Sequence, residues 1–526
     1  MFQKIRELSR NLAIYGLGDV AISVVNFLLL PLYVQYLSPD DYGALGLLGS
    51  VEVIAKIFFR WGLDGSFMRF FYECDDARAR QRLASTIFFF LLAVNGVLLL
   101  LAFAAAPALA RFLFDAAAGT DPPHLFALQL TLLNTFVIGF TFFPFHILRM
   151  EQRALQFSAL TLARSVATVG LRLVLIVGLG YGVLGVVVAD IVVTSALMAV
   201  LLRWFAPIIR PVFSRTILRE TLRFGLPRVP HAAAQQVIAV GDKIILTAFR
   251  PLHEVGLYSM GVSFGLTQKL FLSAFEYAWA PFYYANSREP DAKRLFSSMT
   301  TYGLAVLSLM TAGLSAIGGD LLALVVGPPY VPAADVVTWT AVGVLFQGAY
   351  LLTSIGLNIT KNTQYYAAST AVAAAVNVLL NFALIPRFGL MGAAWANAVA
   401  YAVQAALAFR FSQQVYPVAY ESRRIAAVAS AGLIGFLAAR ALPSMPPAAG
   451  VLVRGLAVVA VYVALLGVTG FFRQDELRAL AALRRRRRTG PLKTRAPEVT
   501  ELGGEIVAAE LPDEDAATPA TPGAGR

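Results

Sequence analysis

Charged residues are scarce in this chain. Only 14% of its 526 residues are Asp, Glu, Lys or Arg, whereas 58% are hydrophobic. A typical globular protein has about 25% charged residues and breaks its apolar runs into short pieces. Here apolar stretches of about 20 residues, the length needed to cross a bilayer, recur from one end of the chain to the other. The composition therefore argues against a soluble fold and predicts a membrane protein with many spans.

Cysteine is almost absent as well. The single Cys74 excludes an internal disulfide, and we expect an ordinary loop thiol there. The sequence also contains no cluster of metal-ligating residues, no glycine-rich phosphate loop and no ATPase motif. We therefore expect neither a metal nor another cofactor.

The apolar stretches predict an all-α polytopic protein with about 14 transmembrane helices. The first stretch follows a short basic segment and is too long for the core of a cleavable signal peptide, so we expect it to be retained as a span. The predicted spans lie near residues 12–36, 42–63, 84–109, 125–149, 154–178, 182–204, 222–249, 256–285, 295–318, 333–358, 364–386, 390–412, 423–441 and 449–471.

Lys and Arg residues gather in alternate loops. The basic segments contain Lys4, Arg6 and Arg10; Arg78, Arg80 and Arg82; Arg203, Arg210, Arg215, Arg219 and Arg223; Arg288, Lys293 and Arg294; Arg423 and Arg424. An even number of spans puts both termini on one side, and the basic loops mark that side as cytoplasmic. We therefore predict a protein of the cytoplasmic membrane with both termini in the cytoplasm. The same alternation accounts for the net charge of +12 without a nucleic-acid partner.

Two parts of the chain resemble each other, which suggests an internal duplication. The stretches that begin at Gln156 and Gln364 have similar patterns, and so do residues 37–43 and 250–256. Transporters are often built from such repeats. We predict a six-helix lobe over residues 1–205, a second lobe over 206–414, two extra helices over 415–472 and a cytoplasmic tail over 473–526.

The predicted tail has its own composition. Arginines fill positions 484–488, and an acidic segment rich in Pro, Ala and Gly follows. We expect this tail to be disordered. The arginine run can bind anionic lipids, at about 1 kcal/mol for each residue near the membrane surface.

A polar stripe runs through the predicted seventh span. On a helix, Arg228, His231, Gln235 and Asp242 fall within about 60° of one another. Each ionisable group at membrane depth costs about 2.5–3.5 kcal/mol on insertion scales, so the stripe must face protein or water. We interpret it as one wall of an internal cavity.

Other spans also carry polar groups. Glu52, Lys56 and Arg60 share a face of the second span, either as a self-satisfied ladder or as a cavity wall that leaves Arg60 free to bind an anion. Arg164 and Arg172 in the fifth span have no local carboxylate at helical spacing. Each of them needs a partner from another helix or from a ligand.

Acidic and basic groups in the later spans have two interpretations. Lys269 and Glu276 share a face of the eighth span, and Glu276 is expected to act as an interhelical counter-ion. Asp242 and Lys243 form either a structural pair or a cation or proton site. His231 and Asp190 are weaker candidates for proton coupling.

Cations outnumber anions in these stripes, which predicts an anionic ligand. The planar guanidinium of Arg suits phosphate because it donates two parallel hydrogen bonds. The predicted substrate-binding residues are Lys56, Arg60, Arg164, Arg172, Arg228, Gln235 and Lys269. The predicted ion-coupling residues are Glu52, Asp242 and Lys243.

Three motifs resemble those of a known family. Leu37-Ser-Pro-Asp-Asp-Tyr-Gly43, Gly241-Asp-Lys-Ile-Ile-Leu and Glu254-Val-Gly-Leu-Tyr258 are similar to hallmarks of the polysaccharide-transport (Wzx-type) branch of the multidrug/oligosaccharidyl-lipid/polysaccharide (MOP) exporter superfamily. The resemblance covers residues 5–472 and implies a fold like that of the multidrug exporters (MATE), with 14 spans in a 6+6+2 arrangement.

The resemblance also implies a function. Such a protein flips an undecaprenyl-pyrophosphate-linked oligosaccharide to the outer leaflet, for lipopolysaccharide O-antigen, capsule or related polymers. A proton or sodium gradient gives the transport its direction, and polysaccharide polymerase and chain-length proteins are further partners. Lobes that rock around a central cavity would give alternating access.

Several alternatives stay open. A lipid II flippase fits the sequence nearly as well, whereas a multidrug exporter normally has 12 spans and an acid-rich cavity. A polymerase or ligase would need a large outer loop with acid and base groups, and the outer loops here are short, so we predict that the protein is not an enzyme. A non-transporting scaffold for glycan synthesis would not need its intramembrane charges.

Overall fold

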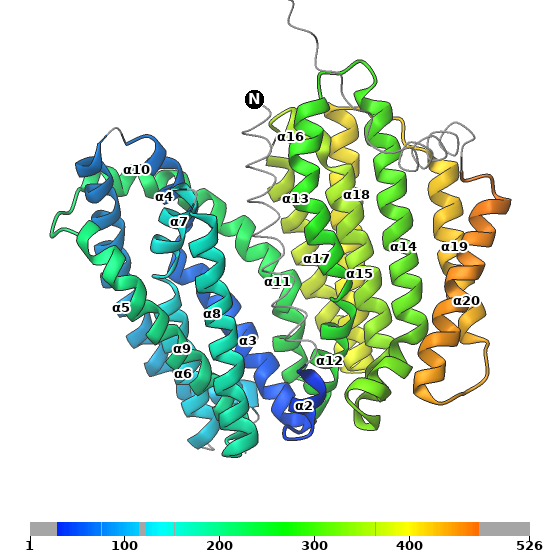
Figure 1. The fold of residues 1–526 in the computed structure, drawn as a ribbon, viewed down its shortest axis with the longest axis horizontal. Helices are drawn as coiled ribbons and strands as arrows, with labels where there is room; N and C mark the ends of the chain where they lie inside the picture. The colour runs from blue at the N-terminus through cyan, green and yellow to red at the C-terminus, as the bar shows by residue number, and fades with distance from the viewer. Residues whose placement is uncertain (1–28, 75, 115–121, 152, 363, 473–526) are drawn as a thin grey trace, which may run out of the picture. The chain divides into compact units, whose positions relative to one another are not determined.

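The computed structural model describes residues 29–74, 76–114, 122–151, 153–362 and 364–472. Every regular element within these ranges is a helix, which confirms the all-α prediction (Figure 1). The described residues up to Phe471 form one compact unit. Most of the predicted first span and all of the predicted tail lie outside the described residues.

Eleven helical segments of the described residues are long and apolar enough to cross a membrane. They match eleven of the predicted spans. The helices that contain these segments are α3 (Pro39–Arg60), α5 (Ala77–Phe114), α6 (Pro122–Ile138) with α7 (Phe142–Met150), α8 (Ala154–Leu173), α9 (Gly182–Phe205), α14 (Ala292–Val325), α15 (Ala334–Thr353) with α16 (Ile355–Ile359), α17 (Gln364–Phe388), α18 (Leu390–Val415), α19 (Ser422–Arg440) and α20 (Pro447–Val468).

The predicted seventh and eighth spans are helical too, but neither is among the eleven. The seventh corresponds to α11 (Val229–Thr247), whose polar residues lower its hydropathy. The eighth is divided at Leu266 and Thr267 into α12 (Leu252–Gly265) and α13 (Gln268–Asn286). At 1.5 Å per residue, α12 is only about 21 Å long, shorter than the hydrocarbon core of a bilayer.

The start and end of α3 are fixed by local sequence. Ser38 and Asp41 form a capping box, and Pro39 occupies the first turn, where its missing N–H is not needed. The helix ends at Trp61 and Gly62, both in the left-handed region with φ of 52° and 67°. The indole of Trp61 donates to Asn95 Oδ1 at 3.3 Å. This sharp turn leads directly into α4 (Leu63–Tyr72).

Neighbouring helices pack through two kinds of contact. Aromatic side chains fill the core between α4, α5 and α7, where the rings of Phe67 and Phe143 lie 5.2 Å apart at 72°. Glycines allow α3 and α12 to pack closely, because a Cβ at Gly256 would overlap the backbone carbonyl of Pro39. Small residues at such contacts are typical of membrane helices.

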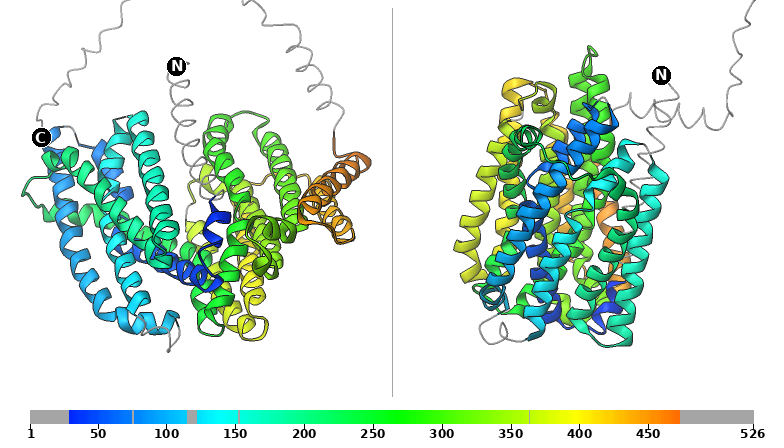
Figure 2. Two further views of the ribbon diagram at one scale, coloured as in Figure 1. Left: turned by 60° about the horizontal axis from the view of Figure 1, so that its bottom comes forward. Right: turned by 90° about the vertical axis from the view of Figure 1, so that its left-hand side faces the viewer.

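The later helices form their own layer. α15 packs against α14 and α18, and α17 lies beside α18. The hairpin of α19 and α20 packs against α14, with Tyr462 donating to the carbonyl of Ala305 at 2.8 Å. Figure 2 shows these elements from two further sides. In the earlier part of the chain, α6 packs against α9.

Candidate functional site

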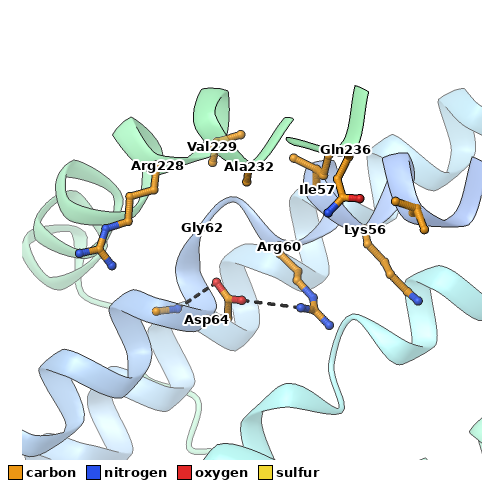
Figure 3. Close-up of a pocket in the computed structure, with 11 residues that line it drawn as sticks. Lys56, Ile57, Arg60, Gly62, Asp64, Arg228, Val229, Ala232 and Gln236 are labelled. Carbon is orange, nitrogen blue, oxygen red and sulfur yellow. Dashed lines mark hydrogen bonds and ion pairs between the residues drawn. The ribbon is translucent and has the colours of Figure 1, made fainter. Parts of the chain in front are cut away.

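A pocket of 420 Å³ lies where α3 and α4 meet the start of α11 (Figure 3). This volume falls within the range of about 300–1,000 Å³ that is typical of small-molecule sites. The turn at Trp61 and Gly62 bends the chain so that residues before and after it face the same space. The lining residues are Val53, Lys56, Ile57, Arg60, Gly62, Asp64, Gly65, Arg228, Val229, Ala232 and Gln236.

Cations dominate this first pocket. Lys56, Arg60 and Arg228 line it together with a single described carboxylate, Asp64. Arg60 Nη1 lies 3.7 Å from Asp64 Oδ2, which is too long for a hydrogen bond, and Asp64 Oδ1 accepts from the backbone N–H of Gly65. The Nε of Arg60 is buried without a hydrogen-bond partner among the described residues. Arg60 therefore has donors left for a ligand.

The sequence allowed two interpretations of Glu52, Lys56 and Arg60 on α3: a self-satisfied ladder of ion pairs or a cavity wall. The structure contains parts of both. Lys56 Nζ lies 2.5 Å from Glu52 Oε1, so these two residues pair on their own helix. Arg60 is held only loosely by Asp64, a residue that the sequence interpretation missed although it stands four positions further on, at the spacing typical of helical ion pairs.

Arg228 is positioned by an aromatic ring. It ends the 3₁₀ turn Leu226–Arg228 that precedes α11, and its guanidinium lies 4.2 Å from the ring centroid of Phe224. Arg69 on α4 lies 4.4 Å from the same centroid. The cation–π contact restricts Arg228 without neutralising it, so its charge is available at the pocket.

The predicted stripe of α11 does not stay together. Ala232 and Gln236, one and two turns beyond Arg228, line the pocket, and Gln236 takes the place that the sequence assigned to its neighbour Gln235. Asp242 lies elsewhere, with 2% of its surface exposed. At 100° per residue, Ala232 and Gln236 lie on one side of Arg228 around the helix, and Gln235 and Asp242 lie on the other side.

The buried carboxylate of Asp242 is surrounded by donors. Its Oδ2 accepts hydrogen bonds from the hydroxyl of Tyr258 on α12 and from Nδ2 of Asn397 on α18, the latter at 3.2 Å. Its Oδ1 accepts from the backbone N–H of Lys243 at 2.8 Å. The sequence analysis named Tyr258 only as part of a family motif and did not name Asn397, because neither contact with Asp242 follows from spacing on one helix.

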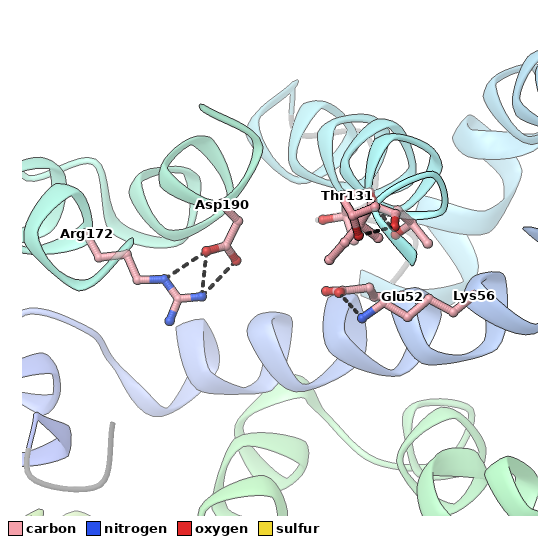
Figure 4. A network of polar contacts seen from close by, with 8 residues as sticks. Glu52, Lys56, Thr131, Arg172 and Asp190 are labelled. Carbon is pink, nitrogen blue, oxygen red and sulfur yellow. Dashed lines mark hydrogen bonds and ion pairs between the residues drawn. The ribbon is translucent and has the colours of Figure 1, made fainter. Parts of the chain in front are cut away.

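A second pocket of 360 Å³ lies between α3, α6, α8 and α9. Its lining is mostly polar and contains Glu52, Asn134, Thr161, Arg164, Ser165, Thr168, Val169, Arg172, Asp190 and Thr194. Figure 4 shows that Arg172 reaches across to Asp190, the partner from another helix that the sequence required. Glu52 lines this pocket while its ion-pair partner Lys56 lines the first, so one ion pair joins the two pockets.

Lys269 is not part of this arrangement. It lies exposed on α13 and lines neither pocket among the described residues. Within the described ranges no ion pair joins Lys269 to Glu276, which lies seven residues further along the same predicted span. No group of three His, Cys, Asp or Glu residues suited to a metal occurs in the described part of the chain.

Comparison with known sequences gives a family. The family model of polysaccharide biosynthesis proteins matches residues 8–284, which is more than half of the chain. An uncharacterized membrane protein of Methanocaldococcus jannaschii is 25% identical over 202 residues. That alignment covers 36% of this chain and 38% of the relative, so the chain spans well under two thirds of that relative's length.

Comparison with solved structures gives a fold. The lipid II flippase MurJ, in an inward closed conformation, superposes with a TM-score of 0.68 at 14% identity, over 86% of this chain and 97% of that one. A multidrug resistance MATE transporter of the MOP superfamily, facing inward, has a TM-score of 0.62 at 16% identity, over 81% and 99%. These similarities establish that the helices are arranged as in these two structures.

Proposed function

The chain belongs to the family of polysaccharide biosynthesis proteins, and from that premise we propose that it flips a polyprenyl-pyrophosphate-linked oligosaccharide across the cytoplasmic membrane. Its fold is that of MOP proteins, among which the solved neighbours are a lipid II flippase and a multidrug transporter. Both neighbours move a molecule across or out of a membrane, and a lipid-linked glycan is the cargo that fits a polysaccharide family.

One observation carries the proposal: the first pocket has an excess of cations. Lys56, Arg60 and Arg228 face a space that holds one described carboxylate, and Arg60 keeps unused donors. A pyrophosphate carries several negative charges in a small volume, and guanidinium groups bind phosphate oxygens in pairs. A site for cationic drugs would need the opposite balance of charges.

The second pocket suits the glycan. Its lining offers hydroxyl groups from Thr161, Ser165, Thr168 and Thr194, which donate and accept hydrogen bonds as sugars do. Arg164 on the same wall supplies a positive charge for acidic sugars. We assign the pyrophosphate to the first pocket and the adjoining sugars to the second, with the ion pair of Glu52 and Lys56 between them.

Transport follows from alternating access. Residues 1–205 and 206–414 act as the two lobes, residues 415–472 as accessory helices, and the lipid tail stays in the bilayer. Ligand binding neutralises the cations of the pocket and so lowers the cost of closing it. Asp242 is the proposed coupling site for a proton or sodium ion, since its carboxylate lies buried between three helices. No covalent step is required.

Reconstituted flipping tests the proposal. Protein in liposomes is given a fluorescent polyprenyl-pyrophosphate oligosaccharide, and the fraction of the label that becomes accessible on the far side is followed with time. We expect Arg60→Gln and Arg228→Gln to slow flipping at least tenfold. Arg440→Gln is the matched control. Arg440 is exposed on α19 and lines neither pocket.

The same assay separates the alternatives. Faster movement of lipid II than of the oligosaccharide lipid would replace the substrate in the proposal, and movement of neither would favour a scaffold. If Arg60→Gln and Arg228→Gln flip as fast as the control, the anion site lies elsewhere.

A further inference from the structure

The short helix α10 (Arg215–Gly225) lies between α9 and α11. Its 11 residues extend about 16 Å, so it is too short to cross a membrane. Two rows run along it at a spacing of four residues. One row contains Arg215, Arg219 and Arg223, and the adjoining row contains Leu218, Leu222 and Leu226. The helix is therefore strongly amphipathic, with arginines next to leucines.

The opposite side of α10 is fixed to the protein. The hydroxyl of Ser66 on α4 donates to the carbonyl of Thr221 at 2.9 Å. A Cβ at Gly225 would lie 2.6 Å from the carbonyl oxygen of Gly62, so these two backbones are in contact. The linker before α10 is also held, since the N–H of Arg210 donates to Ser85 Oγ at 2.8 Å. These contacts fix which side of α10 faces outward.

Both rows line a pocket of 660 Å³ on the outward side. The arginines are exposed, and the lining consists of Arg215, Leu218, Arg219, Leu222, Arg223, Leu226 and Pro227. No acidic residue is among them. The one carboxylate of the helix, Glu220, is about 140° from Arg215 and about 60° from Arg223 around the axis, and it does not line the pocket. The pocket thus presents three cations along one edge, with no carboxylate in its described lining, and an apolar wall along the other.

We propose that this α10 pocket binds one anionic glycerophospholipid of the surrounding membrane. The arginines bind the headgroup phosphate, and the row of leucines contacts the upper part of the acyl chains. Charge complementarity and amphipathicity together require a ligand with a phosphate and a hydrocarbon chain in one molecule. The site is separate from the two proposed transport pockets, with which it shares no lining residue, and it would hold whether or not the protein is a flippase.

Native mass spectrometry of the full-length protein in detergent tests the site. Phosphatidylglycerol and phosphatidylcholine with identical acyl chains are titrated separately, and the occupancy of bound lipid is measured. The wild type should retain one phosphatidylglycerol at concentrations where phosphatidylcholine is lost. Removing the three charges with Arg215→Gln, Arg219→Gln and Arg223→Gln should weaken that binding about 100-fold, at about 1 kcal/mol per arginine.

Two further triple variants serve as controls. Arg288→Gln, Arg294→Gln and Arg423→Gln remove three exposed arginines that line no part of the α10 pocket, and this control should bind phosphatidylglycerol like the wild type. Replacing the α10 arginines with lysine preserves charge and should cause a smaller loss than glutamine. Equal binding of both lipids by the wild type, equal losses in the two glutamine triples, or displacement of phosphatidylglycerol by equimolar polyprenyl phosphate would each overturn the proposal.

Discussion

Arg172 on α8 and Asp190 on α9 form an ion pair with two parallel hydrogen bonds. Nε lies 3.1 Å from Oδ1 and Nη2 lies 2.8 Å from Oδ2. About a quarter of each side chain is exposed, so the pair is partly shielded from water. Within the described ranges Arg164, two turns earlier on α8, has no ion-pair partner on the protein. Two arginines that look equivalent in the sequence therefore differ: Arg172 is neutralised and Arg164 is not.

The first prediction concerns the stability of this pair. Asp190→Asn leaves Arg172 without its carboxylate, and we expect the free energy of unfolding to fall by about 2 kcal/mol, as for other shielded hydrogen bonds to a charge. Arg172→Gln should cost a similar amount, and the double variant should cost less than the sum. Thermal unfolding of the purified wild type, the two single variants and the double variant gives the four stabilities of a double-mutant cycle. Strictly additive losses would mean that the two residues act independently.

The second prediction concerns Arg164. Because no protein carboxylate pairs with it, Arg164→Gln should leave the melting temperature unchanged while slowing oligosaccharide flipping at least tenfold. The liposome assay and a melting curve on the same sample check both parts. Arg172→Gln is the comparison, since it breaks the ion pair with Asp190 and should lower the melting temperature. A fall in stability without a change in flipping would make Arg164 a structural residue.

Much of the fold could be predicted because apolar length is a local property. The eleven segments that are long and apolar enough to cross a membrane match predicted spans, and the division of the eighth span was missed because Leu266 and Thr267 do not break the apolar pattern. The motifs also identified the family correctly. The sequence pattern was sufficient for features that depend on a single helix, such as its length and apolar character.

The site could be predicted only in part, because pairing between helices is not a local property. Arg60 and Arg228 were both predicted to line a substrate cavity, and both line the first pocket. The sequence could not assign Asp190 to Arg172 or Tyr258 to Asp242, since these contacts depend on which helices are neighbours. A helix also has several polar rows, and polarity alone did not show that Gln236 faces the pocket.

The third prediction concerns the close contact of α3 and α12. Gly256→Ala places a methyl group against the carbonyl of Pro39, and separating two helices in this way costs about 1–3 kcal/mol. We expect a lower melting temperature. Gly96→Ala is the control: nothing lies within 4 Å of a Cβ there, and alanine favours the helix by about 0.5–1 kcal/mol. Equal melting temperatures for the two variants would show that α3 and α12 separate without cost.

The fourth prediction concerns Asp242. Asp242→Asn replaces one acceptor oxygen with an amino group facing the donors of Tyr258 and Asn397 or the N–H of Lys243, at a cost of about 1–3 kcal/mol. If Asp242 takes up the coupling ion, flipping by the variant should no longer respond to an imposed proton or sodium gradient. Tyr258→Phe keeps the carboxylate and should keep that response. A response that survives in Asp242→Asn would move the coupling site to another residue.

The fifth prediction concerns Glu52, whose ion pair joins the two pockets. Glu52→Gln releases Lys56 from its partner while Arg60 and Arg228 stay in place, so the positive potential of the first pocket rises. At contact distance in water one unit charge is worth about 1 kcal/mol, which is about a fivefold change in affinity. We expect calorimetry with a short-chain polyprenyl pyrophosphate to show tighter binding by about that factor. Asp335→Asn removes the partner of the exposed Arg440, which lines neither pocket, and should have no effect. Weaker binding in Glu52→Gln would instead mean that Glu52 contacts the ligand itself.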